Sequence, residues 1–176
     1  MSRVLPSLGL LALLSCSVFA AEPEPTIYGR YEYIHLDELG KTLRAKMDTG
    51  AMTASLSARD IKRFERDGEK WVRFRLAMDG ADDTLYEHRL VRVSRIKARN
   101  EEQDVDDEEE ERSQNSAKRP VIEMQLCIGD HQRMIEVNLA DRSHFRYPLL
   151  IGAQAIDKLD GAIDPSRKYT AGRPDC

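Results

Sequence analysis

The chain of 176 residues has a formal net charge of −4, and 41% of its residues are hydrophobic. About 155 residues remain after an N-terminal targeting segment, which suits a single domain with its own hydrophobic core. Three cysteines, one of them within the targeting segment, are too few for a disulfide-rich scaffold.

Residues 1–20 have the features of a secretory signal peptide. Arg3 supplies a positive start and an apolar stretch follows, with Val18 and Ala20 at positions −3 and −1 of a cleavage site before Ala21. The apolar stretch is too short to span a bilayer comfortably. We therefore expect cleavage after Ala20, a mature domain over 21–176 without an integral membrane segment, and a periplasmic or secreted location.

A second interpretation of the same stretch is a lipoprotein signal with a lipid anchor at Cys16. Leu13 lies three residues before this cysteine, and the small Ser15 lies between them. Leu14 fits that pattern poorly, so we favour the cleavable signal peptide.

Strand-like alternation of apolar and polar residues dominates the mature chain. Short alternating or continuously apolar runs, separated by turn residues, predict a β-barrel or a sandwich-like domain. Polar turns are expected at 37–41 and 79–83. The predicted strands are 26–36, 42–47, 70–78, 84–98, 120–128, 133–140 and 147–152.

Two short helices are predicted in addition to the strands. Over 57–68, Ser57 can cap the start, Gly68 can end the helix, and Ile61 and Phe64 form an apolar stripe. A second helix is expected over 153–161, followed by a terminal strand or turn.

An acidic run at 101–111 carries nine carboxylates, so the rest of the chain is net positive. Such a block repels itself and stays hydrated, which predicts a disordered surface insertion at about 100–118. A calcium site is disfavoured because the run lacks the ligand spacing and glycine of an EF-hand.

Cys127 and Cys176 remain after signal cleavage, and an oxidising compartment permits a disulfide between them. Two cysteines are too few for a disulfide framework. We favour a buried Cys127 within a strand and a free thiol at the C-terminus.

Asp48 is the strongest candidate for a catalytic residue. A predicted strand leads into Asp-Thr-Gly at 48–50, where Thr49 can hydrogen-bond locally and Gly50 lets backbone pass close to a carboxylate. Peptide hydrolysis by carboxylates needs two of them, one ionised and one protonated. Because the chain has one such triplet, a second Asp48 would have to come from a two-fold homodimer. Taken alone, the triplet is more often a plain turn.

Other catalytic or cofactor motifs are missing from the sequence. The histidines at 35, 88, 131 and 144 are scattered and form no H-E-x-x-H pair, so we expect no metal. There is no phosphate-binding G-x-x-x-x-G-K-[ST] loop and no G-x-S-x-G elbow. We therefore expect no cofactor and no nucleic-acid partner.

A basic cluster precedes the last predicted strand. Arg142, His144 and Arg146 could recognise an acidic substrate or a terminal carboxylate, because arginine matches carboxylate geometry. The alternative is a solvated loop whose arginines balance nearby acids, and we favour this alternative.

The DTGA turn and a distant "LLIG" followed by a predicted helix together resemble the retropepsin pattern. More closely, the chain resembles the bacterial retropepsin-like family that carries the label "ATP-dependent zinc protease". The similarity covers most of the mature chain, in the expected order. The matching segments are "AKMDTGAMTASLSA" (45–58), "WVRF" (71–74), "RPVIEMQLCIG" (119–129), "LADRSHFRYPLLIGAQAI" (139–156) and "IDPSRKY" (163–169).

This resemblance implies a mostly β, retropepsin-like closed barrel with Asp48 as the catalytic aspartate. It implies that Thr49 braces the loop across a dimer, and that the hairpin 70–92 is a flap over the substrate. The residues implied to form or support the active-site loop are Thr49, Gly50, Ala51, Leu149, Leu150, Ile151 and Gly152.

The resemblance implies an aspartic endopeptidase, a hydrolase that acts on peptide or protein substrates as a homodimer. One departure is Ala153, where arginine commonly follows the glycine of "LLIG" in such enzymes. The alternative is therefore a non-catalytic peptide-binding envelope protein on the same fold.

Overall fold

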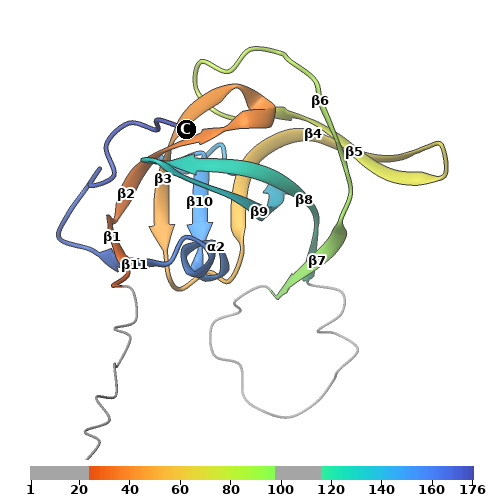
Figure 1. Cartoon of the computed structure of the whole chain (residues 1–176). Coiled ribbons are helices and arrows are strands. Elements are labelled where there is room, and N and C mark those ends of the chain that lie inside the picture. The colour runs from red at the N-terminus through yellow and green to blue at the C-terminus, as the bar shows by residue number, and fades with distance from the viewer. Residues whose placement is uncertain (1–23, 98–115) are drawn as a thin grey trace, which may run out of the picture.

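The computed structural model describes residues 24–97 and 116–176, and in these ranges it contains β-strands and one short α-helix (Figure 1). The elements are β1 (Thr26–Gly29), β2 (Tyr31–Leu36), the 3-10 helix η1 (Asp37–Leu39), β3 (Lys41–Asp48), β4 (Ala54–Arg66), β5 (Glu69–Leu76), β6 (Tyr86–Arg89), β7 (Arg92–Lys97), β8 (Ser116–Ile128), β9 (His131–Ala140), β10 (Leu149–Gly152), α2 (Ala153–Lys158) and β11 (Gly161–Asp164). The predicted mostly β architecture is confirmed.

Six strands close into a barrel. Strands β10, β3, β2, β8, β9 and β4 are hydrogen-bonded in that order, and β10 also pairs with β4. The alternation of the sequence explains the barrel interior: along β3, Leu43, Ala45 and Met47 are buried while the residues between them are exposed. The predicted closed barrel is therefore present.

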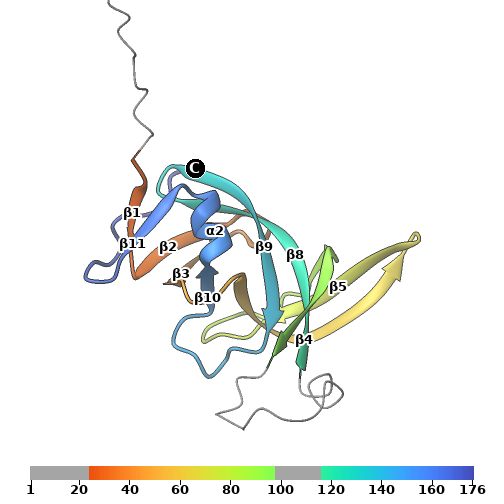
Figure 2. The same ribbon diagram turned by 90° about the horizontal axis from the view of Figure 1, so that it is seen from below.

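The β4–β5 hairpin projects from the barrel (Figures 1 and 2). Its strands pair from Ala58 to Arg66, with a register shift between Arg59 and Lys62. Asp60 has a φ of 54°, and a bulge of this kind bends a strand and increases its twist. The bulge therefore directs the outer half of β4 away from the barrel.

The predicted helix over 57–68 is wrong, because this segment is the outer half of β4. Ser57 caps no helix; its hydroxyl donates to the Ala77 carbonyl at 2.7 Å. The three-residue spacing of Ile61 and Phe64 resembles a helical stripe, but it spans the end of the bulge, where the period of two is interrupted. Gly68 belongs instead to the turn of the hairpin.

The predicted return strand over 84–98 is two strands with different partners. Strand β6 pairs with β5, whereas β7 pairs with β8. The chain passes from pairing with β5 to pairing with β8 at Leu90 and Val91, whose N–H groups donate to the Lys70 and Val121 carbonyls. The helix expected over 153–161 is confirmed in a shorter form as α2.

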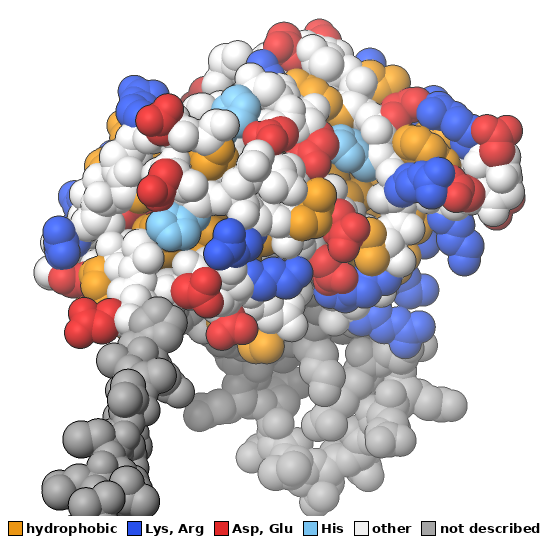
Figure 3. Space-filling model, in the orientation of Figure 1, with side chains coloured by type: hydrophobic (Ala, Val, Ile, Leu, Met, Phe, Trp, Pro, Cys, Tyr) orange, Lys and Arg blue, Asp and Glu red, His pale blue; other side chains and the backbone are white. Residues whose placement is uncertain are grey.

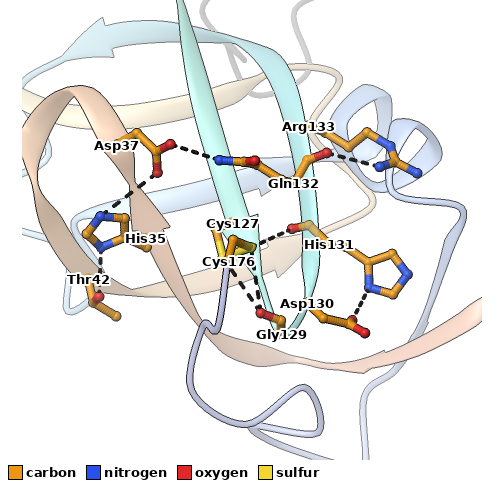
Figure 4. Close-up of a disulfide and its surroundings, with 10 residues drawn as sticks. All are labelled: His35, Asp37, Thr42, Cys127, Gly129, Asp130, His131, Gln132, Arg133 and Cys176. Carbon is orange, nitrogen blue, oxygen red and sulfur yellow. Dashed lines mark hydrogen bonds and ion pairs between the residues drawn. A yellow bond between two sulfur atoms is a disulfide. The ribbon is translucent and has the colours of Figure 1, made fainter.

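The C-terminal segment is fastened to the barrel by a disulfide between Cys127 and Cys176 (Figure 4). Their Cα atoms are 6.0 Å apart, and the Asp175 N–H donates to the Gly129 carbonyl at 2.7 Å. The expectation of a free terminal thiol is therefore wrong: the tail returns to the β8–β9 turn and brings Cys176 to Cys127.

A buried carboxylate holds the same tail further upstream. Glu32, which is fully buried, accepts hydrogen bonds from the N–H groups of Gly29 and Thr170 and from the Thr170 hydroxyl. A buried charge is tolerated when several donors satisfy it. The N-terminal turn and the tail are thus fixed to one side chain.

Two predictions lie outside the described residues: the signal peptide and most of the acidic insertion at 100–118. Within the described ranges, no helix has the length and apolar character needed to cross a membrane.

Candidate active site

Asp48 is the last residue of β3, beside the last residue of β10. The two strands run parallel, and their register pairs Gly152 with Asp48 and Ile151 with Met47. Ile151 is fully buried and Leu150 nearly so, which anchors β10 in the core. The predicted support of the Asp48 loop by 150–152 therefore corresponds to direct strand pairing.

The turn after Asp48 is fixed by backbone hydrogen bonds. The Gly50 N–H donates to Asp48 Oδ1 at 3.2 Å, and the Ala51 N–H donates to the Asp48 carbonyl. On the other side, the Ala153 N–H donates to the Ala51 carbonyl at 2.7 Å. The loop at 48–51 is thus held between its own carboxylate and the first residue of α2, while Thr49 is exposed.

Gly152 allows the loop to lie against β10. A Cβ atom at this position would lie 2.7 Å from the Ala51 carbonyl oxygen and 2.7 Å from the carbonyl of Thr53. These neighbours are backbone atoms, which cannot rotate away. Only glycine fits between β10 and the loop.

The Asp48 carboxylate is partly exposed, with 26% of its side chain accessible, and it lies next to a lysine of the same strand. Lys46 Nζ donates to Asp48 Oδ2 at 2.9 Å. This hydrogen bond, together with the lysine charge and the Gly50 N–H, lowers the pKa of Asp48 below its ordinary value of 3.8, against the opposing effect of burial. In a single chain the carboxylate is therefore ionised at neutral pH.

Arg142 adds a second positive charge to the site. Its guanidinium stacks over the Phe145 ring, 4.4 Å from the centroid, and its backbone N–H donates to Ser57 Oγ. Burial, and then the positive charge of Arg119, lowers the pKa of Arg142, whereas Asp48 raises it. Nε of Arg142 is buried and has no hydrogen-bond partner among the described residues.

The expectation of a solvated basic loop is therefore wrong for Arg142, which is half-buried near Asp48. It holds for His144 and Arg146, whose side chains are exposed. Spacing along the sequence could not separate the three residues, because their burial depends on how the loop folds over β4.

A buried amide supports the segment that follows the loop. Asn138 on β9 accepts a hydrogen bond from Ser55 Oγ and donates to Thr53 Oγ1 and to the Ala54 carbonyl, the latter at 2.7 Å. Asn138 and Ser55 are both almost completely buried. The sequence did not indicate this network, because Asn138 lies within a predicted strand, Ser55 lies in an unassigned segment, and the two residues are 83 positions apart.

The hairpin 70–92 does not form a flap over the Asp48 of its own chain. Asp82 in its polar tip forms an ion pair with Lys41 Nζ at 3.1 Å, and Lys41 begins β3 whereas Asp48 ends it. Seven residues of extended strand separate them by about 23 Å. Arg59 and Arg75 bind Asp83 and fix the tip at that far end.

The described residues around Asp48 and elsewhere in the chain do not form a metal-binding cluster. No group of three or more His, Cys, Asp or Glu residues there is arranged to hold an ion. The donors around Asp48 are a lysine, an arginine and backbone N–H groups, which favour anions rather than cations.

Comparison with known proteins shows which family the chain resembles. Residues 27–174 match the sequence model of a family described as RimB-like, "Retropepsin-like aspartic endopeptidase RimB". A crystal structure of a Legionella pneumophila protein of unknown function is 35% identical, with a TM-score of 0.66. The match covers 83% of this chain and 98% of that one.

The curated relatives are longer proteins. A "Probable alpha-L-glutamate ligase" of Shewanella halifaxensis is 30% identical over 149 residues, which cover 84% of this chain and 30% of that protein. The protein of the same name from Desulfotalea psychrophila is 32% identical over 156 residues, which are 83% of this chain and 29% of that protein. The chain thus corresponds to less than a third of these relatives' length.

Proposed function

Because the chain belongs to the RimB-like family of retropepsin-like aspartic endopeptidases, we propose that it hydrolyses peptide bonds with two Asp48 carboxylates in a homodimer. The observation that carries the proposal is the loop at 48–51, held in register with Gly152 so that the Asp48 carboxylate remains accessible. A catalytic carboxylate must be both fixed in position and open to substrate.

The proposed chemistry divides two roles between identical residues. One Asp48 is ionised and accepts a proton from a water molecule, which attacks the carbonyl carbon of the scissile bond. The other is protonated and donates to the carbonyl oxygen. The carbon–nitrogen bond then breaks, and the amine leaves with a proton.

The charge environment of Asp48 supports one half of this scheme. Lys46 favours the ionised form. A second carboxylate brought close to the first would disfavour ionisation of one member, because two adjacent negative charges repel. The protonated partner thus depends on the dimer, and the resulting pKa values belong to the pair.

Exposed apolar side chains near the loop support the proposal that a second copy or a substrate covers this surface. Met52, which follows the DTGA turn, is 66% exposed, and Phe145, which lies under Arg142, is 60% exposed. Large apolar side chains gathered near a site are typical of surfaces that bind another polypeptide.

We propose that the substrate carries a carboxylate close to the scissile bond. Arg142, half-buried near Asp48 and without an ion-pair partner among the described residues, can bind such a group. The name of the relatives, glutamate ligase, supports a glutamate-containing peptide. Arg142→Gln is then expected to raise KM for Glu-containing peptides more than for matched Gln-containing peptides.

Cleavage of a peptide library by the purified mature chain tests the proposal. The wild type is expected to release defined fragments, and Asp48→Asn is expected to reduce the rate at least a thousandfold. Cleavage that persists in Asp48→Asn would rule out the assignment.

The rival function is peptide binding without cleavage. In that case Asp48→Asn barely changes affinity for peptides, the wild type releases no fragments, and sedimentation shows a monomer at micromolar concentration. We also propose that the chain is periplasmic or secreted and that it acts without a cofactor.

A further inference from the structure

A slot between two open strand edges lies beside the end of β9. Two adjoining cavities of about 630 and 430 Å³ occupy this region, and residues Arg63 and Val93 line both. The smaller cavity is lined by β4 at Ile61, by β8 at 117–120, and by the end of β9 at 139–141. With Val93 of β7, four strands thus contribute to a single depression.

The edge of β4 that faces the slot has no strand partner in the described ranges. Strand β9 pairs with β4 only as far as Ser57. The Ser57 N–H donates to the Pro148 carbonyl, just before β10, and the Ser57 carbonyl accepts from the Ala77 N–H, just after β5. Because the N–H and carbonyl of one strand residue point to the same edge, β5 and β10 lie along the same edge of β4. Beyond Ser57, the edge on the side of β9 is therefore open.

The edge of β8 across the slot is open for the same reason. At Val121, β7 and β9 pair with β8 from its two opposite edges. Residues 116–120 continue to pair with β7 alone within the described chain. Where β9 ends at Ala140, β8 and β4 lie two strand spacings apart, about 9.6 Å, which one added strand fills.

The slot is basic. Its lining includes Arg63, Lys118 and Arg119, against the carboxylate of Asp141. Among carboxylates in the described residues, none lies within 4.0 Å of Arg63 or Lys118. Lys and Arg side chains gather on the side of the molecule that carries the β4–β5 hairpin and β7 (Figure 3).

We propose that this slot binds an extended, acidic polypeptide segment of another protein by strand addition between β4 and β8. Open edges offer backbone carbonyl groups and, except at Pro120, N–H groups, which an extended chain satisfies. The basic side chains select carboxylates, and Ile61 and Val93, both partly exposed, offer apolar contacts. The site is distinct from Asp48, and the proposal does not depend on catalysis.

Strand edges favour a polypeptide over a nucleic acid of the same charge. A nucleic acid neutralises basic side chains but has no backbone amides to complete a strand ladder. A peptide without N–H donors at alternate positions therefore discriminates between ladder formation and simple charge attraction.

Fluorescence anisotropy tests the proposal with the mature chain carrying Asp48→Asn, so that cleavage plays no part. The probe is a labelled decapeptide of alternating Glu and Val. The double variant Arg63→Glu, Lys118→Glu is expected to weaken binding at least tenfold. Arg73→Glu, an exposed arginine of β5 outside both cavities, is the matched control and is expected to change affinity less than twofold.

Two further measurements keep the result interpretable. A decapeptide of alternating Glu and Pro has the same charge and is expected to bind at least tenfold more weakly. In the protein without slot variants, hydrogen exchange at 62–65 and 117–119 is expected to slow when the Glu-Val peptide binds. Fluorescence of Trp71, the only tryptophan, verifies that each variant is folded.

Several outcomes would overturn the proposal. The slot would be shown to bind by charge alone if the Glu-Pro peptide bound as tightly as the Glu-Val peptide, or if Arg73→Glu lost as much affinity as the double variant. Full competition by a ten-nucleotide single strand would show the same. If binding appears only after the acidic residues of 101–111 are neutralised, the occupant of the slot is this acidic run of the same chain and not another protein.

Discussion

Gly152 and Asp48 are direct neighbours in the parallel pair of β10 and β3. Each residue ends its strand. The loop at 48–51 is joined to the start of α2 by a hydrogen bond from the Ala153 N–H to the Ala51 carbonyl. The position of the Asp48 carboxylate is therefore set by a residue that lies 104 positions later in the sequence.

Gly152→Ala tests this relationship. The added methyl meets backbone atoms of Ala51 and Thr53 at 2.7 Å, so the loop must move. We expect a loss of about 3 kcal/mol in the free energy of unfolding, measured with denaturant, and a loss of peptidase activity. Gly50→Ala is the control, because its methyl meets only Asp48 Oδ1 at 3.4 Å. Equal stability of the two variants would contradict the packing described for Gly152.

Lys46→Met tests the electrostatics of Asp48. Lys46 lowers the pKa of Asp48, so its removal raises that pKa. Because the ionised carboxylate is the proposed base, activity is lost as pH falls through its pKa, and the acidic limb of kcat/KM should move to higher pH. Arg44→Met, two residues earlier on the same exposed side of β3, should leave the limb in place. A limb that stays fixed or moves to lower pH in Lys46→Met would refute this role.

The same pair affects stability, and its contribution is also lost toward acidic pH. A lowered folded-state pKa stabilises the protein above 3.8, the ordinary value, and this contribution is lost as pH falls. Lys46→Met should therefore lower the free energy of unfolding at neutral pH and leave it nearly unchanged at low pH, where Asp48 is protonated in the folded and the unfolded state. Denaturant unfolding across this pH range should show a flatter acid dependence than in the wild type.

Cys176→Ser tests the C-terminal disulfide. The bridge joins residues 49 positions apart and so restricts the unfolded chain. Its removal should lower the free energy of unfolding by about 2–4 kcal/mol. The reduced wild type should match Cys176→Ser, while reduction should not change the stability of Cys176→Ser itself. Unchanged stability after reduction would show that the tail is held by Glu32 and the hydrogen bonds alone.

Asn138→Leu tests the buried amide network. The substitution leaves the Ser55 hydroxyl without its acceptor and removes the donor to the Ala54 carbonyl, both in the interior. We expect a loss of about 2–4 kcal/mol in stability, because each unpaired buried polar group costs about 1–3 kcal/mol. The double variant Asn138→Leu, Ser55→Ala should recover part of the loss, and a purely additive result would argue against the network.

The sequence was sufficient for most of the barrel strands but not for β4. The correct strands depend on local patterns: alternation buries Leu43, Ala45 and Met47, and a continuous apolar run makes β10 a buried strand. The position of Asp48 at a strand end followed from the same alternation. The relationship between the DTGA turn and "LLIG" came from the family resemblance and not from a local pattern.

The helix predicted at 57–68 failed because a local signal was overlooked. Asp67 and Gly68 both have positive φ, 53° and 76°, as a two-residue hairpin turn requires. An Asp-Gly pair between β-forming stretches is a strong hairpin signal. The bulge at Asp60 then created a spacing that imitates a helical stripe.

Other features could not be read from the sequence because they depend on distant contacts. Arg142 is half-buried only because its loop folds over Ser57, and the tip at 79–84 is remote from Asp48 only because it pairs with Lys41. The disulfide forms because the tail returns to the β8–β9 turn, where the Asp175 N–H donates to the Gly129 carbonyl. No local pattern encodes these encounters.

The central claim, two Asp48 carboxylates acting together, is tested most directly by mixing subunits. Wild-type and Asp48→Asn chains are equilibrated at fixed total concentration, and peptide cleavage is measured against the wild-type fraction. If each active site needs Asp48 from both subunits, activity falls as the square of that fraction. A linear fall would show that one Asp48 is sufficient and would contradict the proposed dyad.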